Sequence, residues 1–588
     1  MTTDVSSVLP ISDLRPLISP KRWRLRGRLA EDPLAGAPYP PLIRHLLWHR
    51  GLRTAAEATA FVDGAPIAYD PLLLPDIELA LERLQRAVHA GETVAVYGDF
   101  DVDGVTASAI LIEGIRGVGG KAISYHPDRF AEGYGVHTGA IDVLHAQGTK
   151  LLVTADCGTG AVAEVEHAAR LGIDTIVVDH HTVPQQLPNA VALINPKRAD
   201  NHYPDPELAS GGLAFKLMAA LYEKLGRYWD AGRYLDLVAL STICDVAPLR
   251  DENRTLVQQG LAALSNTQRP GLRALIENSG IDPRYVSAED IGYALGPRLN
   301  AAGRLAHARL ALELLMEEDT GRAIQRAADL STLNEQRRQA TAAAMDLARE
   351  LLADDDPGAP ITFVGHPNIS SGIVGIIAGR LAEERYRPAV VYEAGDETSR
   401  ASCRSIPEFD ITAALRTCPD LMVRFGGHRA AAGFTVENAK LPALKQALLR
   451  EAAERLAGLD LTPVIDIDAA IPLGRVNGNL IQWLQRLAPF GQANSDPTFL
   501  SRDLEVIESR TMGDGSHLRL SLRDGRVTWP AVAFGMGSAD VQPGQRLDVV
   551  YTFSPDRGSE GALELRVIDL APAGSRPVEG SRPEGEPN

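Results

Sequence analysis

The pattern that most constrains this chain is a repeat of short β-branched runs and helix-like segments between Gly91 and about Val178. The runs are TVAVY, KAISY, KLLVTA and DTIVV, and a segment of helical pattern follows each of the first three. Such alternation predicts a parallel sheet with helices on both faces. Open sheets of this kind bind ligands at the carboxyl ends of their strands. We therefore expect the functional site where these runs end.

The rest of the chain divides by pattern into further segments. Residues from about Arg233 to Leu314 are typical of helices, and a stretch from about Arg322 to Ala353 without Gly or Pro predicts one long connecting helix. A second, smaller α/β pattern follows, and then short strands with turn signals indicate a small β-barrel or sandwich. The expected boundaries are 1–70 for an N-terminal segment, 71–315 for the parallel-sheet domain, 316–356 for the connecting helix, 357–458 for the second α/β domain, 459–570 for the all-β domain and 571–588 for a disordered tail rich in Pro, Gly, Ser and Glu.

Composition excludes several classes of protein. Lys plus Arg number 59 and Asp plus Glu 76, and the net charge of −17 argues against a protein that coats nucleic acid or an anionic membrane by net charge alone. The four cysteines are far apart and form no CxxC pair, which fits a reducing cytosol. No signal-peptide pattern opens the sequence, and no apolar run reaches the roughly 18 residues of a membrane helix. We expect a cytoplasmic protein without membrane contact.

The strongest local signal is GDFDVDG at residues 98–104, which follows the run TVAVY and precedes a helical pattern. Asp99, Asp101 and Asp103 alternate there, and residues two apart on an extended backbone point the same way. At least two of these carboxylates are expected to face one cation, without which they would repel one another. The alternatives are a solvated acidic turn and an EF-hand-like calcium loop, although the glutamate that closes such a loop is absent from the motif.

Two more strand ends carry ligand-type residues. Asp156 ends the run KLLVTA, and Asp179, His180 and His181 end the run DTIVV. Asp245, in the apolar stretch ALSTICDVAPL, is a further candidate because a buried carboxylate is costly without a cation or a donor. Asp156 and Asp245 alone would equally suit a turn or a helix cap. The coincidence at three neighbouring strands favours a site.

This mixture of carboxylates and imidazoles predicts a site for hard divalent cations. Carboxylate oxygens suit Mg²⁺ and Mn²⁺, and histidine ligands shift the preference toward Mn²⁺. Cys157 and Cys244 adjoin two expected ligands, and we expect both to pack in the interior, with binding of a soft metal as the alternative. Five or six ligands are enough for two ions, which favours hydrolysis of a phosphoester or phosphoanhydride.

These motifs resemble, in order, those of the DHH superfamily of phosphoesterases. The resemblance rests on GDFDVDG, TADCGTG, VVDHH and ICDVAPL, and GGHRAAAGF is similar to the signature of the DHH-associated domain. Four further segments are similar to the bacterial exonucleases of this superfamily that are specific for single-stranded DNA: PDRFAEGYG, GPRLNAAGR, SSGIVGIIAGR and LAPFGQANSDPTF. The resemblance implies a parallel-sheet DHH catalytic domain, a smaller α/β DHH-associated domain joined to it by a long helix, and an all-β OB-like barrel.

The resemblance also implies an activity and a set of metal ligands. The activity is 5′-to-3′ hydrolysis of single-stranded DNA to 5′-mononucleotides in recombination and repair, with two divalent cations, Mn²⁺ or Mg²⁺. Asp101 and Asp103 would each bind one ion, Asp156 would bridge both, and His180 with Asp245 would complete one shell.

Other residues of these motifs are implied with different roles. Asp99 is a further metal ligand candidate, and His181 would join Asp156 and His180 in catalysis by contacting the scissile phosphate, while Asp179 orients a neighbouring group. Related pyrophosphatases have a histidine four residues before the DxD pair. Tyr97 stands at that position here, which argues against a pyrophosphatase.

Phosphate contacts are expected from glycine-rich and basic segments. In GGHRAAAGF, paired glycines let the backbone approach an anion while His428 and Arg429 supply donors. SSGIVGIIAGR would present backbone N–H groups at a helix N-terminus. A turn, a helix cap or solvated charges would give the same patterns. The expected substrate-binding residues are Arg298, Asn300, Arg304, Ser370, Ser371, Gly372, Arg400, Arg404, Gly426, Gly427 and His428.

Two other functions compete with the exonuclease. Phosphodiesterases of short oligonucleotides or cyclic dinucleotides share the DHH and GGH motifs but usually lack the barrel and the GPRLNAAGR stretch. A non-catalytic scaffold would have lost its ligands, which are intact here. The resemblance suggests a single-stranded-DNA-binding protein and a RecQ-type helicase as partners of a monomeric enzyme.

Overall fold

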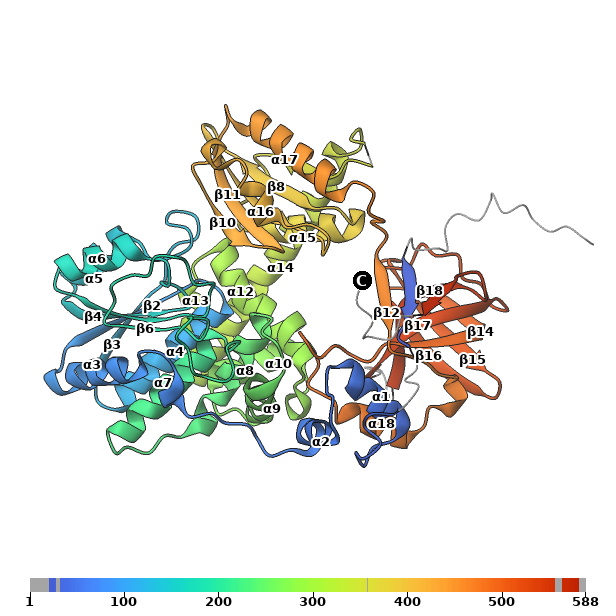
Figure 1. Ribbon diagram of the computed structural model, residues 1–588, viewed down its shortest axis with the longest axis horizontal. Helices are drawn as coiled ribbons and strands as arrows, with labels where there is room; N and C mark the ends of the chain where they lie inside the picture. Colours follow the sequence, from blue (N-terminus) through green and yellow to red (C-terminus); the bar gives the residue numbers. More distant parts are fainter. Residues whose placement is uncertain (1–20, 28–31, 357, 556–562, 581–588) are drawn as a thin grey trace, which may run out of the picture. The chain divides into compact units, whose positions relative to one another are not determined.

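The computed structural model describes residues 21–27, 32–356, 358–555 and 563–580 (Figure 1). Internal contacts divide the chain into two compact units. The larger unit comprises Pro66–Leu459 and Pro489–Asn494. The other, called the barrel unit below, comprises Met1–Ala65, Asp460–Ala488 and Ser495–Asn588. Within the described ranges, no helix combines the length and the apolar character that crossing a membrane requires.

A five-stranded sheet organises the first half of the larger unit. Its strands are β2 (Thr93–Gly98), β3 (Lys121–Tyr125), β4 (Thr149–Ala155), β5 (Asp174–Val178) and β6 (Ala192–Ile194). They lie in the order β3-β2-β4-β5-β6, and every pair is parallel. The predicted parallel sheet is therefore confirmed. The strand β6 was not predicted, because three residues are too short for a periodic signal.

Both faces of this sheet are buried under helices. Val94 and Val96 of β2 belong to one hydrophobic core, and the alternating residues Ala95 and Tyr97 belong to another. Successive side chains of a strand point to opposite faces, so each strand contributes to both cores. Helices on the first face are α3 (Ile77–Ala90), α4 (Val102–Gly117) and α7 (Ser210–Lys224), and on the second α5 (Thr138–Ala146) and α6 (Val162–Arg170) (Figure 1).

The helical region after the sheet ends in one long helix. α14 (Thr320–Leu351) begins after Asp319, whose side chain accepts a hydrogen bond from the Arg322 amide. This confirms the predicted connecting helix. The preceding helices are α8 (Leu235–Cys244), α9 (Asp251–Ser265), α10 (Pro270–Asn278), α11 (Ala288–Asp290), α12 (Gly296–Leu305) and α13 (Arg309–Leu315).

The C-terminal half of the larger unit is a mixed sheet on the far part of α14. Ala344, Met345 and Ala348 of α14 share a hydrophobic core with α15 (Val374–Arg385). The sheet order is β10-β11-β9-β8-β7, in which only β7 and β8 pair in parallel. The remaining elements are β7 (Thr362–Gly365), β8 (Ala389–Ala394), β9 (Thr398–Arg404), α16 (Ile411–Leu415), β10 (Arg424–His428), β11 (Ala431–Glu437) and α17 (Leu441–Leu456).

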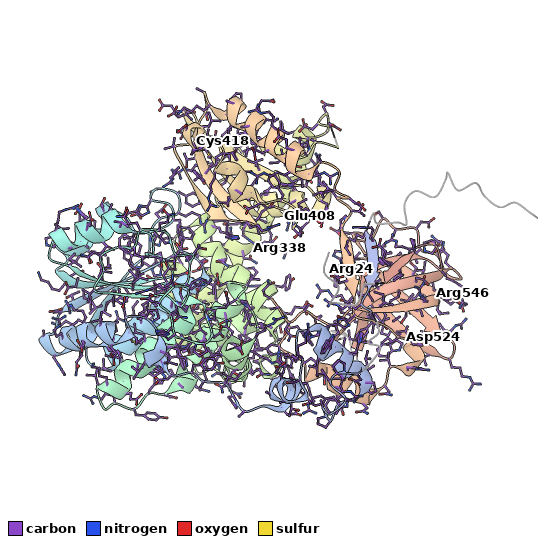
Figure 2. All side chains as sticks on the ribbon, viewed as in Figure 1. Arg24, Arg338, Glu408, Cys418, Asp524 and Arg546 are labelled. Atoms are coloured by element: carbon purple, nitrogen blue, oxygen red, sulfur yellow. The ribbon has the colours of Figure 1, made fainter. Side chains whose placement is uncertain are left out.

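The barrel is closed by pairing between β14 (Phe499–Met512) and β17 (Arg546–Pro555). β13 (Ala469–Ala470), β14 (Phe499–Met512), β15 (His517–Asp524), β16 (Val527–Ala533), β18 (Leu563–Pro572) and β17 (Arg546–Pro555) follow one another in the sheet, and β14 also pairs with β17. Figure 2 shows Asp524 and Arg546 on these strands. The predicted all-β domain is thus a barrel, and the helices of the unit are α1 (Pro41–His49), α2 (Ala55–Asp63) and α18 (Gly478–Gln485).

Both ends of the chain contribute to the barrel unit. β1 (Arg22–Leu25) lies between β12 (Val464–Ile467) and β19 (Val578–Gly580) and pairs in parallel with each. Trp23 of β1 is completely buried, and its Nε1 donates to Asp569 Oδ2 at 2.9 Å. The tail was expected to be disordered from residue 571 to 588, but part of this range forms strands, because β18 ends at Pro572 and β19 follows it. Residues 581–588 lie outside the described ranges.

Candidate functional site

Three aspartates lie directly after neighbouring strands. Asp99 follows β2, Asp156 follows β4 and Asp179 follows β5. Each donates its backbone N–H to the carbonyl at the end of the adjacent strand: Asp99 to Ala155, Asp156 to Val178 and Asp179 to Ile194, at 3.0–3.1 Å. The stagger of the parallel strands therefore brings the three carboxylates to one edge of the sheet, where the sequence predicted the site.

The DxD pair reaches this edge in a different way from the one expected. Asp101 is the N-cap of α4 and accepts a hydrogen bond from the Gly104 amide at 3.1 Å. Asp103 lies inside the first turn of that helix. The prediction that these residues alternate along an extended strand is wrong, because β2 ends at Gly98 and α4 begins at Val102.

Asp103 is held by the N-terminus of α7. Its Oδ2 accepts the Ser210 amide at 2.8 Å, and its Oδ1 accepts the Gly211 amide at 2.9 Å. The Ser241 hydroxyl of α8 donates to the same Oδ1 at 2.5 Å. Partial positive charge at the helix N-terminus favours a carboxylate there, and the three hydrogen bonds hold the buried Asp103 side chain in a fixed orientation.

The ligand-type side chains form three groups whose atoms lie within 4.8 Å of one another. His180 Nε2 lies 3.3 Å from Asp156 Oδ1, 3.5 Å from Asp245 Oδ2 and 3.6 Å from Asp103 Oδ2. The Nε2 atom of His180 is buried and forms no hydrogen bond. Asp99 Oδ1 is also buried without a hydrogen-bond partner. The groups are Asp99–Asp101–Asp156, Asp103–His180–Asp245 and Asp156–His180–His181.

These unpaired atoms fit a divalent cation. An imidazole nitrogen surrounded by three carboxylate oxygens at 3.3–3.6 Å is too far for good hydrogen bonds but is arranged around a common centre. The donor set of oxygens with one or two imidazoles is the one that suits Mn²⁺ and Mg²⁺. Asp156 belongs to two of the three groups.

The electrostatics of the site reflect crowding of like charges. Burial, followed by the charges of Asp103 and Asp101, raises the pKa of Asp245 to about 8. Burial also raises the pKa values of Asp99 and Asp156 well above their usual range, and neighbouring carboxylates add to the effect. Nearby positive charge would relieve this repulsion.

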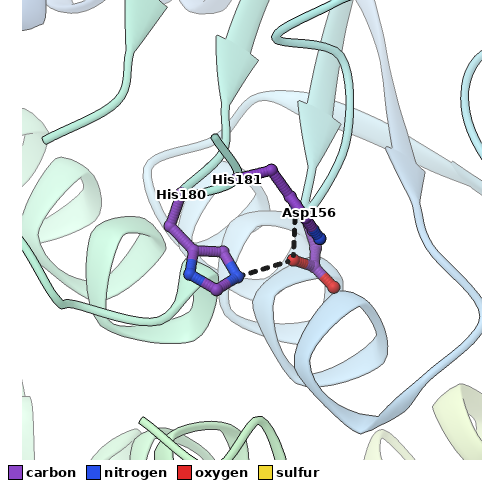
Figure 3. Close-up of side chains that lie close together, drawn as sticks. All are labelled: Asp156, His180 and His181. Atoms are coloured by element: carbon purple, nitrogen blue, oxygen red, sulfur yellow. Dashed lines mark ion pairs between the residues drawn. The ribbon is translucent and has the colours of Figure 1, made fainter. Parts of the chain in front are cut away.

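His181 is oriented by Asp179. Burial lowers the pKa of His181, but the hydrogen bond between its Nδ1 and Asp179 Oδ1, 2.8 Å long, outweighs this and raises the pKa to about 9. Asp179 also accepts the amides of His180, His181 and Thr159. His181 Nδ1 lies 3.8 Å from Asp156 Oδ1, as Figure 3 shows together with the shorter contact of His180. His181 is half exposed and its Nε2 is the ring nitrogen left for a substrate.

The cysteines next to the ligands pack in the interior, as predicted. Cys157 is buried in the core beneath α5 and α6, and Cys244 packs against the core on the other face. Burial raises the pKa of both thiols.

The expected phosphate contacts are distributed over several environments. Arg298 donates to Ala294 O and Ser331 Oγ within the helical region, and Arg400 donates to Phe130 O. The Ser371 amide, expected to bind an anion, donates to Glu393 Oε2 at 3.0 Å. These contacts place three of the candidates in packing between elements, and their role toward substrate stays a prediction.

The remaining candidates border open surface or the helix α12. Gly426, Gly427 and His428 form the exposed end of β10, and the charges of Arg404 and His181 act on His428. Asn300 and Arg304 are half-buried on α12. Ser370 and Gly372 precede α15, and a Cβ on Gly372 would lie 2.2 Å from Arg304 O, so the glycine permits close packing there.

Half-buried arginines beside the candidate metal ligands form a cluster that the sequence only partly indicated. Burial and the charges of Arg129 and Arg337, with a smaller effect of Arg404, lower the pKa of Arg304 to about 9. Across the described residues, no carboxylate forms an ion pair with Arg129, Arg304 or Arg404. Arg129 stacks 3.7 Å from the centre of the Phe100 ring and donates to Gly303 O.

The N-terminus of α15 completes this cluster. A Cβ on Gly375 would lie 3.1 Å from Ser402 Oγ and 3.3 Å from Arg404 Nη2, so the glycine keeps the helix end open toward both side chains. Helix N-termini and unpaired arginines both favour anions. We call Arg129, Arg304, Ser402 and Arg404 the arginine pocket. Sequence reasoning missed Arg129, although it lies in the motif PDRFAEGYG, and Ser402, although it lies between the expected residues Arg400 and Arg404.

Family comparisons agree with this architecture. The model of the DHH family N-terminal domain matches residues 93–242, that of the DHHA1 domain residues 358–457 and that of the RecJ OB domain residues 467–569. The three matches confirm the expected DHH domain, DHH-associated domain and OB-like barrel.

Relatives cover most of the chain. The single-stranded-DNA-specific exonuclease RecJ of Salmonella typhimurium is 35% identical over a match of 576 residues, and the match covers 94% of this chain and 96% of that protein. RecJ of Bacillus subtilis is 35% identical over 87% of this chain, which spans 66% of that longer protein. The crystal structure of RecJ from Thermus thermophilus in complex with Mn²⁺ has a TM-score of 0.81 and 30% identity, covering 96% of this chain and 81% of that one.

A second structure of the Thermus thermophilus protein, in complex with Mg²⁺, has a TM-score of 0.76 and 29% identity, covering 95% of this chain and 79% of that one. Full-length similarity at this identity, together with matching models for all three domains, identifies the family. The chain belongs to the RecJ family of single-stranded-DNA-specific exonucleases.

Proposed function

We propose that the chain hydrolyses single-stranded DNA from the 5′ end to 5′-mononucleotides, with two divalent cations, in DNA recombination and repair. The observation that carries this is that the three ligand groups, two of which contain Asp156, lie close to the arginine pocket, whose arginines form no ion pair with a carboxylate of the described residues. Asp101 is close enough for its charge to act on Arg304. A cleaved phosphate and a terminal phosphate would therefore lie side by side.

The residues fit two ions, one in each ligand group. Asp99, Asp101 and Asp156 would hold one, and Asp103, His180 and Asp245 would hold the other. Asp156, whose Oδ1 lies 3.3 Å from His180 Nε2, would be the ligand that the two ions share. Bound Mn²⁺ or Mg²⁺ would supply activation of water and stabilisation of charge on the phosphoryl oxygens.

The protein's own groups position the strand. The arginine pocket would hold the terminal 5′-phosphate through charge-assisted hydrogen bonds. Water adds to the next phosphorus while the P–O3′ bond to the terminal nucleotide breaks, which releases that nucleotide with its 5′-phosphate and leaves a new 5′-phosphate on the strand. His181, whose Nδ1 is held by Asp179, would present Nε2 to the scissile phosphate.

The barrel would bind the strand beyond the cleaved nucleotide. Phe534 is half exposed, its ring lies 5.2 Å from His517 in an edge-to-face arrangement, and Arg566 lies 5.7 Å from its centre. An exposed ring beside a guanidinium is a typical platform for unpaired bases. Phe499 of β14, in contrast, is buried in the barrel core.

The proposal is tested by end-labelled oligonucleotides with Mn²⁺. Loss of a 5′ label as mononucleotide from a single strand, with blunt duplex spared, is the expected result. Loss of a 3′ label first would contradict the polarity, and cleavage of dinucleotides alone would favour a small-substrate phosphodiesterase. Size-exclusion chromatography with single-stranded-DNA-binding protein or a RecQ-type helicase tests the expected monomer and partners.

The arginine pocket has its own test. Arg304→Met should raise KM about 10- to 100-fold for a 5′-phosphorylated strand, because a hydrogen bond to a charged group contributes about 1.5–3 kcal/mol, and should affect a 5′-hydroxyl strand little. Arg309→Met on the following helix α13 is the matched control, since Arg309 forms an ion pair with Glu313 and has no proposed role toward substrate. Equal effects of the two substitutions would contradict the assignment.

A further inference from the structure

A short loop of residues 489–494, PFGQAN, returns from the barrel unit into the larger unit. We call it the strap. Gly491 and Asn494 exchange backbone hydrogen bonds of 3.0 and 3.2 Å, and the buried Asn494 side chain donates Nδ2 to Pro489 O at 2.8 Å. These hydrogen bonds within the loop fix its conformation. It lies in one of the motifs that the catalytic site leaves unexplained, LAPFGQANSDPTF.

The strap binds the segment that joins α8 to α9. The Leu249 amide donates to Gln492 O at 2.8 Å, and Arg250 Nε donates to Ala493 O at 3.1 Å. A Cβ on Gly491 would lie 2.8 Å from Leu249 Cδ1, so the two segments are in close contact. Leu249 is almost completely buried. The strap therefore holds Leu249 by a backbone hydrogen bond and by packing, and it holds Arg250 by a side-chain hydrogen bond.

That segment begins with Asp245 and contains backbone strain. Asp245 is the C-cap of α8, and Val246 follows with φ +58°, in the left-handed region that glycine usually occupies at this position. The Val246 amide bonds to Ile243 O and the Ala247 amide to Thr242 O. A β-branched residue in this conformation is strained and persists only where surrounding contacts fix it.

We propose that the strap is a positioning element of the metal site, which fixes the strained segment 245–250 and thereby keeps Asp245 beside His180. α8 holds the first half of the segment, and the strap holds the second half. Without the strap, rotation of the segment would relieve the strain at Val246 and move the Asp245 carboxylate. The inference rests on the proposed function, in which Asp245 is a metal ligand.

The test uses the full chain with Asn494→Ala, which removes the bond that closes the strap. Binding of Mn²⁺ alone is measured by electron paramagnetic resonance of the free ion, and kcat and KM are measured on a single strand. Mn²⁺ affinity should fall about tenfold, as for other groups that orient a ligand, and kcat should fall at unchanged KM. Asn477→Ala is the matched control, because Asn477 caps α18 in the barrel unit; it should leave Mn²⁺ binding unchanged.

A double-mutant cycle with Asp245→Asn separates the strap from the proposed ligand. If the strap acts through Asp245, Asn494→Ala should lower Mn²⁺ affinity less than twofold in the Asp245→Asn background. Unchanged Mn²⁺ binding in Asp245→Asn alone would overturn the ligand assignment. Weakened binding in Asp245→Asn, with either no effect of Asn494→Ala or multiplied effects in the double variant, would overturn the role of the strap.

If Asn494→Ala loses its cooperative melting transition, the experiment is repeated with Gly491→Ala in its place. Its Cβ forces Leu249 Cδ1 to shift while the chain stays intact, and the same outcomes decide the question.

Discussion

Replacing Asp156 with asparagine should stabilise the metal-free protein and abolish its stabilisation by Mn²⁺. Asp156 is completely buried and has φ +66°, a conformation that asparagine and aspartate both tolerate. Asparagine also keeps an acceptor for the Ser210 hydroxyl, which donates to Asp156 Oδ1 at 3.1 Å. The substitution therefore removes the charge and preserves the local backbone.

The magnitude follows from the spacing of the carboxylates. Oxygen atoms in the Asp99–Asp101–Asp156 group lie within 4.8 Å of one another. At this separation and an effective dielectric constant of about 20, one pair of negative charges repels by about 3.5 kcal/mol. Relaxation and proton uptake reduce the difference, and we expect about 1 kcal/mol to be gained, which corresponds to a rise of about 2 °C in Tm.

Thermal melts at pH 9, with EDTA and with Mn²⁺, provide the assay. This pH lies above the value of about 8 to which burial and neighbouring carboxylates raise the pKa of Asp245. Mn²⁺ at 100 times its Kd should stabilise the native chain by about 2.7 kcal/mol and the variant hardly at all, and kcat should fall at least about 100-fold. A variant that melts lower in EDTA and keeps the Mn²⁺-induced rise would refute the reasoning.

Three further predictions concern positions around the site and in the barrel unit. Gly98→Ala should destabilise the larger unit by about 1–3 kcal/mol in urea unfolding, because its Cβ would lie 2.1 Å from Ser108 Oγ; if Ser108→Ala does not restore part of the loss, the clash is not the cause. Burial, aided by His307, lowers the pKa of His126 from 6.5 to about 3, so the unfolded chain binds a proton first and stability falls as the pH drops below 6.5, by about 2 kcal/mol at pH 5. His126→Gln should flatten the dependence of Tm on pH between 7 and 5, and parallel profiles would contradict this. Trp23→Ala should cost about 3–5 kcal/mol and give the barrel unit a separate, earlier transition in calorimetry, whereas an unchanged profile would show that β1 contributes little.

The parallel sheet and its functional edge could be predicted because periodicity and ligand residues coincide locally. Each β-branched run is continuous, and Asp99, Asp156 and Asp179 stand at the ends of three of them. Asp103 lies among the predicted ligand residues, but for a different reason from the one expected. A helix that starts within one residue of Asp101 brings both carboxylates to this edge of the sheet as well as an extended strand would.

Features that depend on distant pairing could not be predicted. β1 is a four-residue segment, and its partner Val464 lies more than 400 residues from Arg22, so nothing near Trp23 indicates a strand. The arginine pocket combines residues from a loop, a helix and a strand, and chain order alone does not show that Arg129 approaches Arg304. The same reason explains why Arg298 and Arg400, equally basic in sequence, bond elsewhere.

The assembly of the barrel unit from both ends of the chain has a consequence for biosynthesis. The ribosome makes β1 long before β12 and β19, and at about 5–20 residues per second the first partner follows after about 20–90 s. During that time the larger unit, whose main segment is continuous in sequence, has every strand of its two sheets available. The apolar side chain of Trp23 has no native partners until translation approaches its end. A nascent chain of this protein should therefore contain every proposed metal ligand before the partners of its N-terminal strand have been made, while Trp23 stays exposed.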